Sequence, residues 1–487
     1  MSTYEYETVV GLEVHAQLLT QSKLFCGDST QFGNVPNTQV SPITLAHPGT
    51  LPRINRKAIE FAIRMGLACE SEIVKENYFA RKNYFYPDLP KGYQVSQHTT
   101  PICRGGRIMI KSSDGTRNIR LNRIHLEEDA GKSLHDVDPA FTSLDFNRAG
   151  VALIEIVSEP DLHNGEEAYS YLTELRKLVR YLGICDGNME EGSLRCDANI
   201  SVRKKGESKL GTKVEIKNLN SIRNVKRAIE FEAARMASLL KAGESIMQET
   251  RSFDAGTGET FSMREKEEAE DYRYFPDPDL PKFILQEEFI EAIKNSIPEL
   301  QNEKIKRYKN DWKLSEYDAT VLTEEKSFAE YFEKIIDCIG SRERQHNVKA
   351  AVNWMLGPVR SWLNENHKEI EEFPLPHATI ARIIQLIEEG KLNFSVASTK
   401  LFNYLLKNDH ADPAVAAKEN NWLQESGKDF NEELVDAVLK KFPEKVHEYR
   451  KGKKGLMSLF VGEVMKLSKG KADPMITTEI LNEKLKT

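Results

Sequence analysis

The sequence predicts an α+β protein, with a mostly antiparallel sheet and helices in its first part and helices alone in the remainder. Up to about residue 290, strand and helix periodicities alternate, whereas after Ile297-Pro298 apolar residues recur almost wholly at spacings of three and four. The length of 487 residues also exceeds what one hydrophobic core usually serves. We therefore expect two or three domains, with a boundary in the early 290s.

Several segments of the first part show the period-two alternation of half-buried strands. In residues 9–18, apolar side chains alternate with Glu13, His15 and Gln17. Asp114-Gly115 predicts a hairpin turn. Further strands are expected at 107–111, 118–126, 152–157, 196–203 and 213–217. One face of the resulting sheet would be unusually polar, as a site for a charged substrate requires.

Helices are predicted within the sheet region and throughout the second part. Helices 165–182 and 222–242 are each followed by glycine, which favours helix termination. Residues 446–454 are expected to be a basic linker between the last two helices. The helices expected after residue 297 are 317–322, 328–339, 348–364, 377–389, 393–406, 413–422, 431–441 and 455–468.

Composition and charge narrow the class of protein. The formal net charge of −7 argues against a uniformly basic nucleic-acid coat but allows a basic face on one domain. No stretch approaches 18 consecutive apolar residues, the N-terminus is acidic where a signal peptide would be basic, and the six cysteines form no C-x-x-C pair. These features predict a cytoplasmic location, reduced cysteines and no membrane contact.

The segment His125–Ser133 places three consecutive acids before Gly131-Lys132-Ser133. A phosphate-binding loop, Gly-x-x-x-x-Gly-Lys-Ser/Thr, would need glycine where Leu126 stands, so the phosphate-loop interpretation is excluded. Clustered carboxylates stay ionised together mainly when a cation or several donors lie between them. The segment therefore suggests a divalent metal site.

Other residues strengthen the metal hypothesis. Glu13 and His15 share one strand face, and Glu155 lies inside the apolar strand 152–157. Carboxylates with at most one imidazole favour magnesium or manganese over zinc. Each group also has an ordinary structural interpretation, namely a solvated strand face, a turn after a strand, or a buried salt bridge.

Basic residues on the polar strands could contact phosphate, although each could equally be a salt-bridge partner of the acids. They are Arg81, Lys82, Arg195, Arg203, Lys213 and Lys217.

Two segments rich in aromatic residues and proline, Arg81–Pro90 and Asp271–Pro281, are expected to be rigid, extended loops. They could form the rim of the polar site or simply cover sheet edges.

Several of these motifs, in this order, resemble the B-subunit family of the tRNA-dependent amidotransferases, and the likeness runs from about residue 6 to the C-terminus. The motifs are Gly11–His15, Arg81–Pro90, His125–Ser133, Glu190–Asn199 and Asp271–Pro278.

The resemblance implies three domains and a two-step reaction. The domains would be an N-terminal cradle (1–296), a helical domain (297–408) and a helical tail like that of the YqeY proteins (409–487). The cradle would use ATP to phosphorylate the side-chain carboxylate of glutamate mischarged on tRNA(Gln), or aspartate on tRNA(Asn). Ammonia from the A-type glutaminase subunit would then displace phosphate, while the small C-type subunit would hold the heterotrimer together.

The resemblance also implies roles for individual residues. His15, Glu128 and Glu155 would bind Mg²⁺, or Mn²⁺ in its place, and Glu13 would be a further ligand or guide ammonia. The implied catalytic set is Glu13, Glu128 and Lys217, and the polar residues expected to face nucleotide or substrate are Arg81, Lys82, Arg195, Asp197, Asn199 and Lys213.

The chain departs from many relatives in one loop. Those relatives bind zinc through C-x-C and C-x-x-C motifs, whereas the matching positions here are Cys26, Asp28, Ser41 and Thr44. One thiol cannot hold a structural zinc ion, so we predict none.

For the tail, the resemblance suggests contact with the body of the tRNA. Lys451, Lys453, Lys454 and Lys466 would supply the charge that phosphate contacts need. A solvated helix end is the alternative.

Two other classes of protein compete with the amidotransferase hypothesis. A metal-dependent phosphoesterase would favour two metals and more convergent aspartates than this sequence offers. A catalytically silent tRNA-binding scaffold would tolerate loss of the acids.

Overall fold

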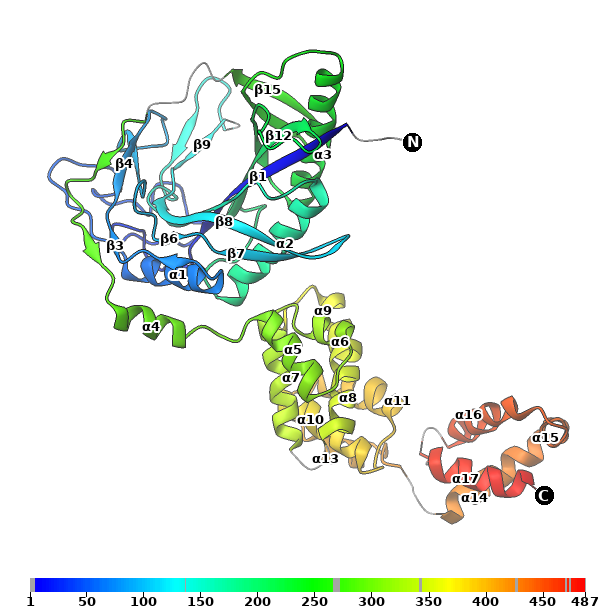
Figure 1. Ribbon diagram of the computed structural model, residues 1–487. Coiled ribbons are helices and arrows are strands. Elements are labelled where there is room, and N and C mark those ends of the chain that lie inside the picture. The colour runs from blue at the N-terminus through cyan, green and yellow to red at the C-terminus, as the bar shows by residue number, and fades with distance from the viewer. Residues whose placement is uncertain are drawn as a thin grey trace. The chain divides into compact units, whose positions relative to one another are not determined.

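The chain forms two compact units, Met1–Leu300 and Gln301–Thr487, in a computed structural model (Figure 1). The first combines a sheet with helices and the second is helical, which confirms the predicted α+β class. None of the helices within the described ranges is long and apolar enough to cross a membrane. The structure describes residues 5–135, 137–265, 272–340, 344–424, 428–468, 471–472 and 474–486, so Asp271 of the second aromatic segment lies outside it.

The first unit is built on a 13-stranded sheet with β1 (Tyr6–Gln17) near its centre. β1 pairs antiparallel with β11 (Ala152–Ser158) on one side and β12 (Leu194–Lys204) on the other, and β8 (Gly115–Glu128) follows β11. Among the described strand pairs only β13 with β14 is parallel, which confirms the mostly antiparallel prediction. The other strands are β2 (Glu72–Ile73), β3 (Glu76–Asn77), β4 (Ala80–Asn83), β5 (Tyr93–Ser96), β6 (Cys103–Arg104), β7 (Arg107–Ser112), β9 (Lys132–Leu134), β10 (Ser143–Asp145), β13 (Val214–Leu219), β14 (Glu249–Asp254), β15 (Glu259–Glu265), β16 (Phe275–Pro276) and β17 (Phe283–Ile284).

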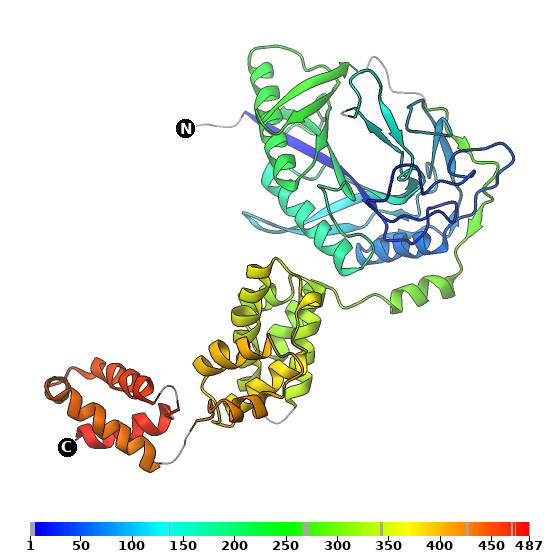
Figure 2. The same ribbon diagram turned by 180° about the vertical axis from the view of Figure 1, so that it is seen from behind.

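Helices α1 (Arg56–Ala68), α2 (Gly165–Tyr181) and α3 (Ile222–Lys241) lie along one side of this sheet (Figures 1 and 2). Alternation along β1 buries Leu12 and Val14 completely in the core that these helices share with the sheet. The same alternation leaves the polar side chains of β1 on the opposite face. The predicted polar face therefore exists, and it is the face free of these three helices.

The first unit ends after α4 (Glu287–Asn295), whose Ile290 and Ile293 belong to the sheet core. Its boundary at Leu300 lies close to the expected boundary at residue 296.

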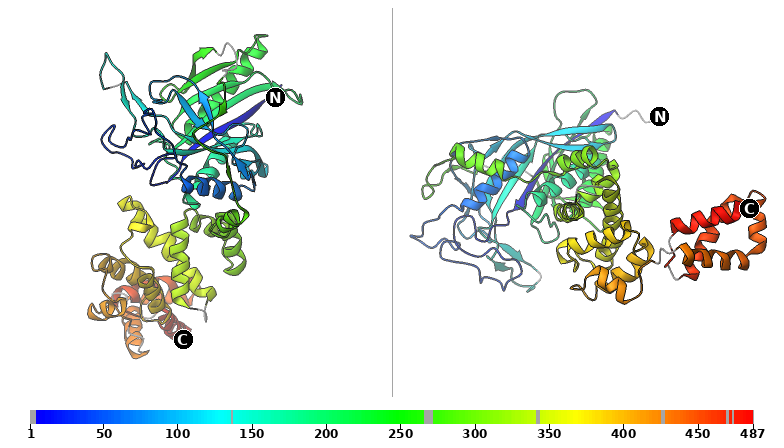
Figure 3. Two further views of the ribbon diagram at one scale, coloured as in Figure 1. Left: turned by 90° about the vertical axis from the view of Figure 1, so that its left-hand side faces the viewer. Right: turned by 90° about the horizontal axis from the view of Figure 1, so that it is seen from below.

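The second unit is helical throughout its described ranges (Figure 3). Its described residues form two hydrophobic cores, and helices α5 to α13 surround the first of them. This core includes Ala416 and Ala417, with Trp422 packed against it, so the boundary expected at 408–409 falls within packed structure. The helices around it are α5 (Gln301–Asp311), α6 (Glu316–Leu322), α7 (Lys326–Ile339), α8 (Arg344–Trp354), η1 (Met355–Val359), α9 (Arg360–Asn366), η2 (Ile370–Glu372), α10 (His377–Glu388), α11 (Phe394–Val396), η3 (Ala397–Leu401), α12 (Phe402–Leu405) and α13 (Pro413–Glu419).

The last core belongs to the tail helices α14 (Lys428–Lys441), α15 (Pro443–Arg450), α16 (Met457–Leu467) and α17 (Pro474–Lys486). The prediction of a linker at 446–454 was wrong, because α15 and the short helix η4 (Lys454–Leu456) occupy most of it. The basic composition of residues 446–454 is typical of a linker. However, Tyr449 is buried in this core, so the segment packs as part of the helical tail.

Candidate functional site

A cavity of about 1330 Å³ lies on the polar face of the sheet. Strands β1, β8, β11, β12 and β13 supply most of its charged lining. The cavity is therefore built from the polar alternation that the sequence shows on these strands. Many of the predicted site residues line it, namely Glu13, His15, Lys82, Glu155, Arg195, Asp197, Lys213 and Lys217.

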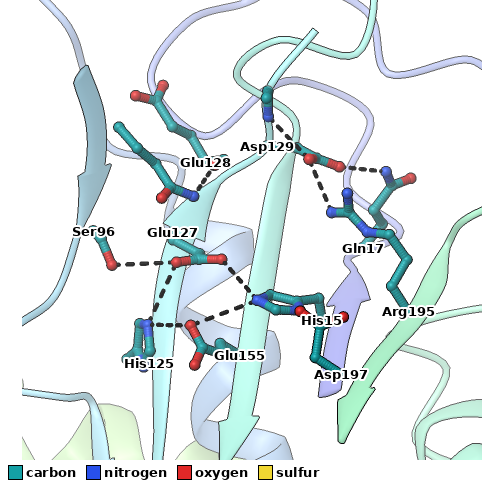
Figure 4. Close-up of polar contacts among 12 residues, drawn as sticks. His15, Gln17, Ser96, His125, Glu127, Glu128, Asp129, Glu155, Arg195 and Asp197 are labelled. Atoms are coloured by element: carbon teal, nitrogen blue, oxygen red, sulfur yellow. Dashed lines mark hydrogen bonds and ion pairs between the residues drawn. The ribbon is translucent and has the colours of Figure 1, made fainter. Parts of the chain in front are cut away.

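Four side chains at the floor of the cavity form a compact group, which we call the acid–histidine cluster: His15, His125, Glu127 and Glu155 (Figure 4). His15 Nε2 lies 3.5 Å from Glu127 Oε1 and 3.6 Å from Glu155 Oε2. His125 Nε2 lies 3.0 Å from Glu155 Oε2 and 3.5 Å from Glu127 Oε2. Each carboxylate thus contacts both imidazoles.

Strand register brings this cluster together. His15 on β1 is the Cα partner of Glu155 on β11, which in turn is the Cα partner of His125 on β8. Glu127 follows two residues later on β8, so it projects from the same face as His125. Three neighbouring strands therefore align the four side chains.

The cluster holds charge despite its burial. Burial disfavours a charged imidazole, but the Glu155 and Glu127 carboxylates more than offset this and raise the pKa of His125 to about 9. The same carboxylates raise the pKa of His15. Burial opposes the ionisation of Glu155, yet His125 and His15 hold the pKa of this carboxyl well below its usual value. The two carboxylates are therefore balanced by positive charge.

The donor set fits a divalent cation. One ligand atom from each of His15, Glu127 and Glu155 can be chosen such that all three atoms lie within 4.8 Å of one another. Two carboxylates and one imidazole match the preferences of magnesium or manganese. A cation here would take over the charge balance that protonated histidines otherwise provide, because an imidazole must lose a proton to bind metal.

The structure corrects one member of the predicted metal set. Glu128 follows Glu127 on β8 and therefore points to the other face, away from the cluster (Figure 4). Its Oε2 lies 2.5 Å from Lys91 Nζ, and its Oε1 accepts a hydrogen bond of 2.9 Å from the Val95 amide. A run of three acids does not reveal which one faces the site. Counting in steps of two from His125 would have indicated Glu127, which is absent from the predicted set.

Asp129, the third acid of the run, anchors a neighbouring part of the wall. It accepts hydrogen bonds of 2.6 Å from Gln17 Nε2 and 2.9 Å from Arg195 Nη2. Burial opposes its ionisation, but Arg195 and Arg148 keep the pKa of Asp129 below its usual value. Arg195 therefore lines the cavity with its charge partly neutralised.

A second charged group lies where β1, β12 and β13 adjoin. Lys217 Nζ lies 2.7 Å from Asp197 Oδ2 and 3.0 Å from Glu215 Oε1, and these acids raise the pKa of Lys217 although burial opposes them. Asn199 Nδ2 donates a 2.8 Å hydrogen bond to Glu13 Oε1. Four predicted residues therefore come together beside the acid–histidine cluster, because Asp197 is the Cα partner of Glu13. They are Glu13, Asp197, Asn199 and Lys217.

The predicted nucleotide contacts separate into two groups. Lys82 and Lys213 line the cavity. Arg81 does not; its Nε lies 2.9 Å from Asp277 Oδ2 and its Nη2 lies 2.9 Å from Asp279 Oδ2. Arg81 therefore joins the two aromatic-proline segments, which is the salt-bridge alternative left open by the sequence.

The four positions that match zinc ligands in relatives are close together. Asp28 Oδ2 accepts hydrogen bonds of 2.7 Å from the Ser41 amide and 2.5 Å from Thr44 Oγ1. Cys26 Sγ lies 3.4 Å from the same hydroxyl. One thiol, one carboxylate and two hydroxyl side chains fall short of the four Cys or His ligands of a structural zinc site, and the Asp28 carboxylate accepts hydrogen bonds from Ser41 and Thr44, so the residues do not fit this metal. The absence of zinc stays a prediction, and a hydrogen-bonded Asp28 occupies the centre of the loop.

The tail lysines are exposed. Lys451 caps α15, Lys453 and Lys454 lie at η4, and Lys466 lies in the last turn of α16. Lys453 Nζ is 3.2 Å from Glu448 Oε2, and Lys454 Nζ lies 4.3 Å from the centre of the Tyr449 ring.

Comparison with known proteins gives consistent matches over nearly the whole chain. Residues 8–291 match the family model described as the GatB/GatE catalytic domain, and residues 330–485 match the GatB domain. The aspartyl/glutamyl-tRNA(Asn/Gln) amidotransferase B subunit of Thermodesulfovibrio yellowstonii is 47% identical over 482 residues, covering 99% of this chain and 100% of the relative. Those of Pelagibacter ubique (47% over 480 residues, 99% and 96%) and Chlorobium chlorochromatii (48% over 481 residues, 99% and 99%) are similarly close.

The polar cavity of the first unit lies within the catalytic-domain match, and the helical second unit contains the match to the GatB domain. The resemblance inferred from the motifs is confirmed: the chain belongs to the B-subunit family of the glutamine-hydrolysing tRNA amidotransferases, which are ligases.

Proposed function

We propose that this chain phosphorylates the side-chain carboxylate of glutamate or aspartate carried by a mischarged tRNA, using ATP and Mg²⁺, and then forms the amide with ammonia supplied by a glutaminase subunit. The relatives are named as B subunits of aspartyl/glutamyl-tRNA(Asn/Gln) amidotransferase, which supports amidation on tRNA. The acid–histidine cluster on the cavity floor is the observation that carries the phosphorylation step.

Phosphorylation must bring two anions together, the substrate carboxylate and the γ-phosphate. Magnesium, when bound, would screen their repulsion and polarise the phosphoryl oxygens. His15, Glu127 and Glu155 would hold the ion, because their ligand atoms converge from adjacent strands. His125 would position both carboxylates through its contacts with Glu127 and Glu155.

The cationic wall would orient the phosphates. Three cations line the cavity: Lys213 directly before β13, Lys217 on β13 and Arg195 on β12. Lys217 is held by Asp197 and Glu215, which fixes the direction of its ammonium group. A positioned cation stabilises charge that develops on the transferring phosphoryl group.

Glu13 and Asn199 would act in the amidation step. Ammonia must lose a proton as the carbon–nitrogen bond forms and phosphate leaves. The Glu13 carboxylate lies in the cavity and is oriented by Asn199 Nδ2, so it can accept that proton or first hold ammonium.

The proposed partners follow from the same function. The A-type and C-type subunits would complete a cytoplasmic heterotrimer, with the A-type glutaminase supplying ammonia. The exposed lysines of the tail would contact the tRNA body.

The test compares Glu127→Gln with the adjacent Glu128→Gln in the reconstituted heterotrimer. We expect Glu127→Gln to lower ATP-dependent phosphorylation of charged tRNA by about a hundredfold or more while glutaminase activity persists. Glu128→Gln should retain phosphorylation, because this side chain points away from the cluster. Full phosphorylation by Glu127→Gln would reject the site and favour a scaffold. Phosphate release from phosphoesters without glutamine or tRNA would instead favour a phosphoesterase.

A further inference from the structure

Aromatic side chains from two distant segments line one side of the cavity, and we call them the aromatic wall: Tyr84, Phe85, Tyr86, Tyr272 and Tyr274. The first three follow β4, and the other two precede β16, which pairs with β4. If these two segments only covered a sheet edge, their rings would not need to line a polar cavity. Both aromatic-proline segments therefore contribute to the rim of the site.

Hydrogen bonds and ring contacts join four of the five rings of the wall, Phe85 being the exception. Asn83 donates its backbone N–H to Tyr272 O at 3.0 Å and its side-chain N–H to Arg273 O at 2.9 Å, which ties the two segments together. The ring of Tyr84 lies 5.9 Å from that of Tyr86 and 6.1 Å from that of Tyr272, in edge-to-face contacts. Edge-to-face packing fixes ring orientations without stacking these rings upon each other.

The rings of the wall differ in exposure. The Phe85 side chain is 91% exposed and that of Tyr86 is 55% exposed, whereas the other three rings are half-buried. Phe85 lies against Gly92, where an added Cβ would come within 3.2 Å of its ring. The rings thus extend from solvent into the cavity.

The inner end of the wall lies near the acid–histidine cluster. Tyr274 lines the same cavity as Glu127 and Glu155, and burial together with these carboxylates raises the pKa of Tyr274 to about 12. Tyr274 also stacks on His98, with ring centres 4.1 Å apart. A ligand that follows the rings inward would end beside the proposed phosphorylation site.

Cations accompany the rings. Lys82 Nζ lies 4.6 Å from the centre of the Tyr272 ring and 5.6 Å from that of Tyr84, and Arg123 lines the same cavity. Rigid aromatic rings combined with cations are the combination that binds unpaired nucleotides, because each base offers a flat face and each phosphate a negative charge. A single nucleotide would use one ring, whereas this wall offers several in succession.

We propose that the aromatic wall stacks the unpaired bases at the 3′ end of the aminoacyl-tRNA, with the terminal base innermost, and so delivers the esterified amino acid to the acid–histidine cluster. This inference rests on the proposed function and adds the part of the substrate that the wall recognises.

The test is a double-mutant cycle between the wall and the tRNA end. Binding of intact tRNA, and of tRNA lacking its last three nucleotides, is measured by fluorescence anisotropy on the assembled heterotrimer without ATP or glutamine. The protein variants are Phe85→Leu and Tyr272→Leu, which keep apolar volume but lose the flat ring, with Tyr272→Phe as the ring-preserving control. Phe32→Leu is the matched surface control, because Phe32 is 71% exposed and does not line the cavity.

In wild type, truncation should weaken binding by about tenfold or more for each base that loses its stack. In Phe85→Leu and Tyr272→Leu, truncation of the tRNA should weaken binding much less than in wild type. In Tyr272→Phe and Phe32→Leu, truncation should weaken binding as much as in wild type. An undiminished penalty in both leucine variants, or no penalty in wild type, would overturn the proposal. So would a raised KM for ATP with unchanged tRNA binding, since the rings would then hold the adenine of ATP.

The same cycle in a Glu127→Gln background separates this inference from the proposed chemistry. The binding pattern should persist there although phosphorylation is lost. If phosphorylation survives in Glu127→Gln but the cycle behaves as expected, the metal assignment fails and the aromatic wall stands.

Discussion

His15 on β1 and Glu155 on β11 are Cα partners in adjacent strands, and their side chains meet with Nε2 3.6 Å from Oε2. A shift of one residue in this register would turn one of them toward the hydrophobic core. The register therefore decides that a glutamate within an apolar strand faces a histidine in the cavity. This relationship supports the metal site and the predictions that depend on it.

Removal of one proposed ligand should weaken cation binding. We expect Glu155→Gln to lower the affinity for Mn²⁺, used as a probe, by about tenfold or more, because a charged ligand is replaced by a neutral amide. Titration calorimetry of the protein without nucleotide gives this affinity. Glu191→Gln is the control, since that side chain is exposed and does not line the cavity. Equal affinities in Glu155→Gln and wild type would contradict the assignment.

The pKa of about 9 for His125 predicts a pH-dependent stability in the absence of divalent metal. Because this value lies above that of an unfolded histidine, about 6.5, the protonated ring stabilises the fold below pH 6.5. That contribution, up to about 3 kcal/mol, is lost as the pH rises through 9. Denaturant unfolding in EDTA between pH 6 and 10 should show a larger decline in wild type than in His125→Gln, in which only His15 of this pair remains. If the free energy of unfolding changed with pH in the same way in both proteins, the predicted role of His125 would be rejected.

Glu128 should matter for stability through its contact with Lys91. Its carboxyl is buried with one ammonium group and one amide as partners, so Glu128→Ala leaves both without this acceptor. We expect a loss of about 3 kcal/mol in the free energy of unfolding. Glu128→Gln, which retains an acceptor oxygen, should lose less. Unfolding in urea provides the measurement, and an unchanged midpoint for Glu128→Ala would count against the contact.

Asp28 should stabilise the loop in which relatives hold zinc. Asp28→Ala removes the acceptor for the Ser41 amide and the Thr44 hydroxyl, which should cost about 1–3 kcal/mol and expose the loop to proteolysis. Zinc chelators should leave the melting temperature of wild type unchanged. Stoichiometric zinc found by elemental analysis would refute the proposed replacement of metal by hydrogen bonds.

The tail lysines should contribute non-specific charge to tRNA binding. Replacing Lys451, Lys453 and Lys454 with glutamate should weaken tRNA affinity and reduce the slope of log affinity against log salt by about two or more. The control for altered charge is the same change to glutamate at Lys407, Lys418 and Lys440, which lie on other helices or at their ends. Unchanged affinity and slope in the glutamate variant would leave the lysines as solvated surface.

The amino-acid sequence was enough to predict the fold class, the family and part of the charged lining of the cavity. Alternation along residues 9–18 sends Glu13 and His15 to one face because successive strand residues point in opposite directions. Motifs such as Glu190–Asn199 are local, so they identify the family without any knowledge of packing. Helices such as α1 and α17 are not among the predicted elements, since short apolar patterns do not reveal which neighbours will bury them.

The structure was needed to show which groups each of Glu127, Glu128 and Asp129 contacts. Alternation from His125 separates the direction of Glu127 from that of Glu128, but the partners that these side chains meet follow from the pairing of β8 with β11 and β5. The same holds for the aromatic wall, whose two segments are joined by β4 and β16 although they are far apart in the chain. Sequence patterns fix what a residue can do locally, whereas strand register and long-range pairing fix which residues meet.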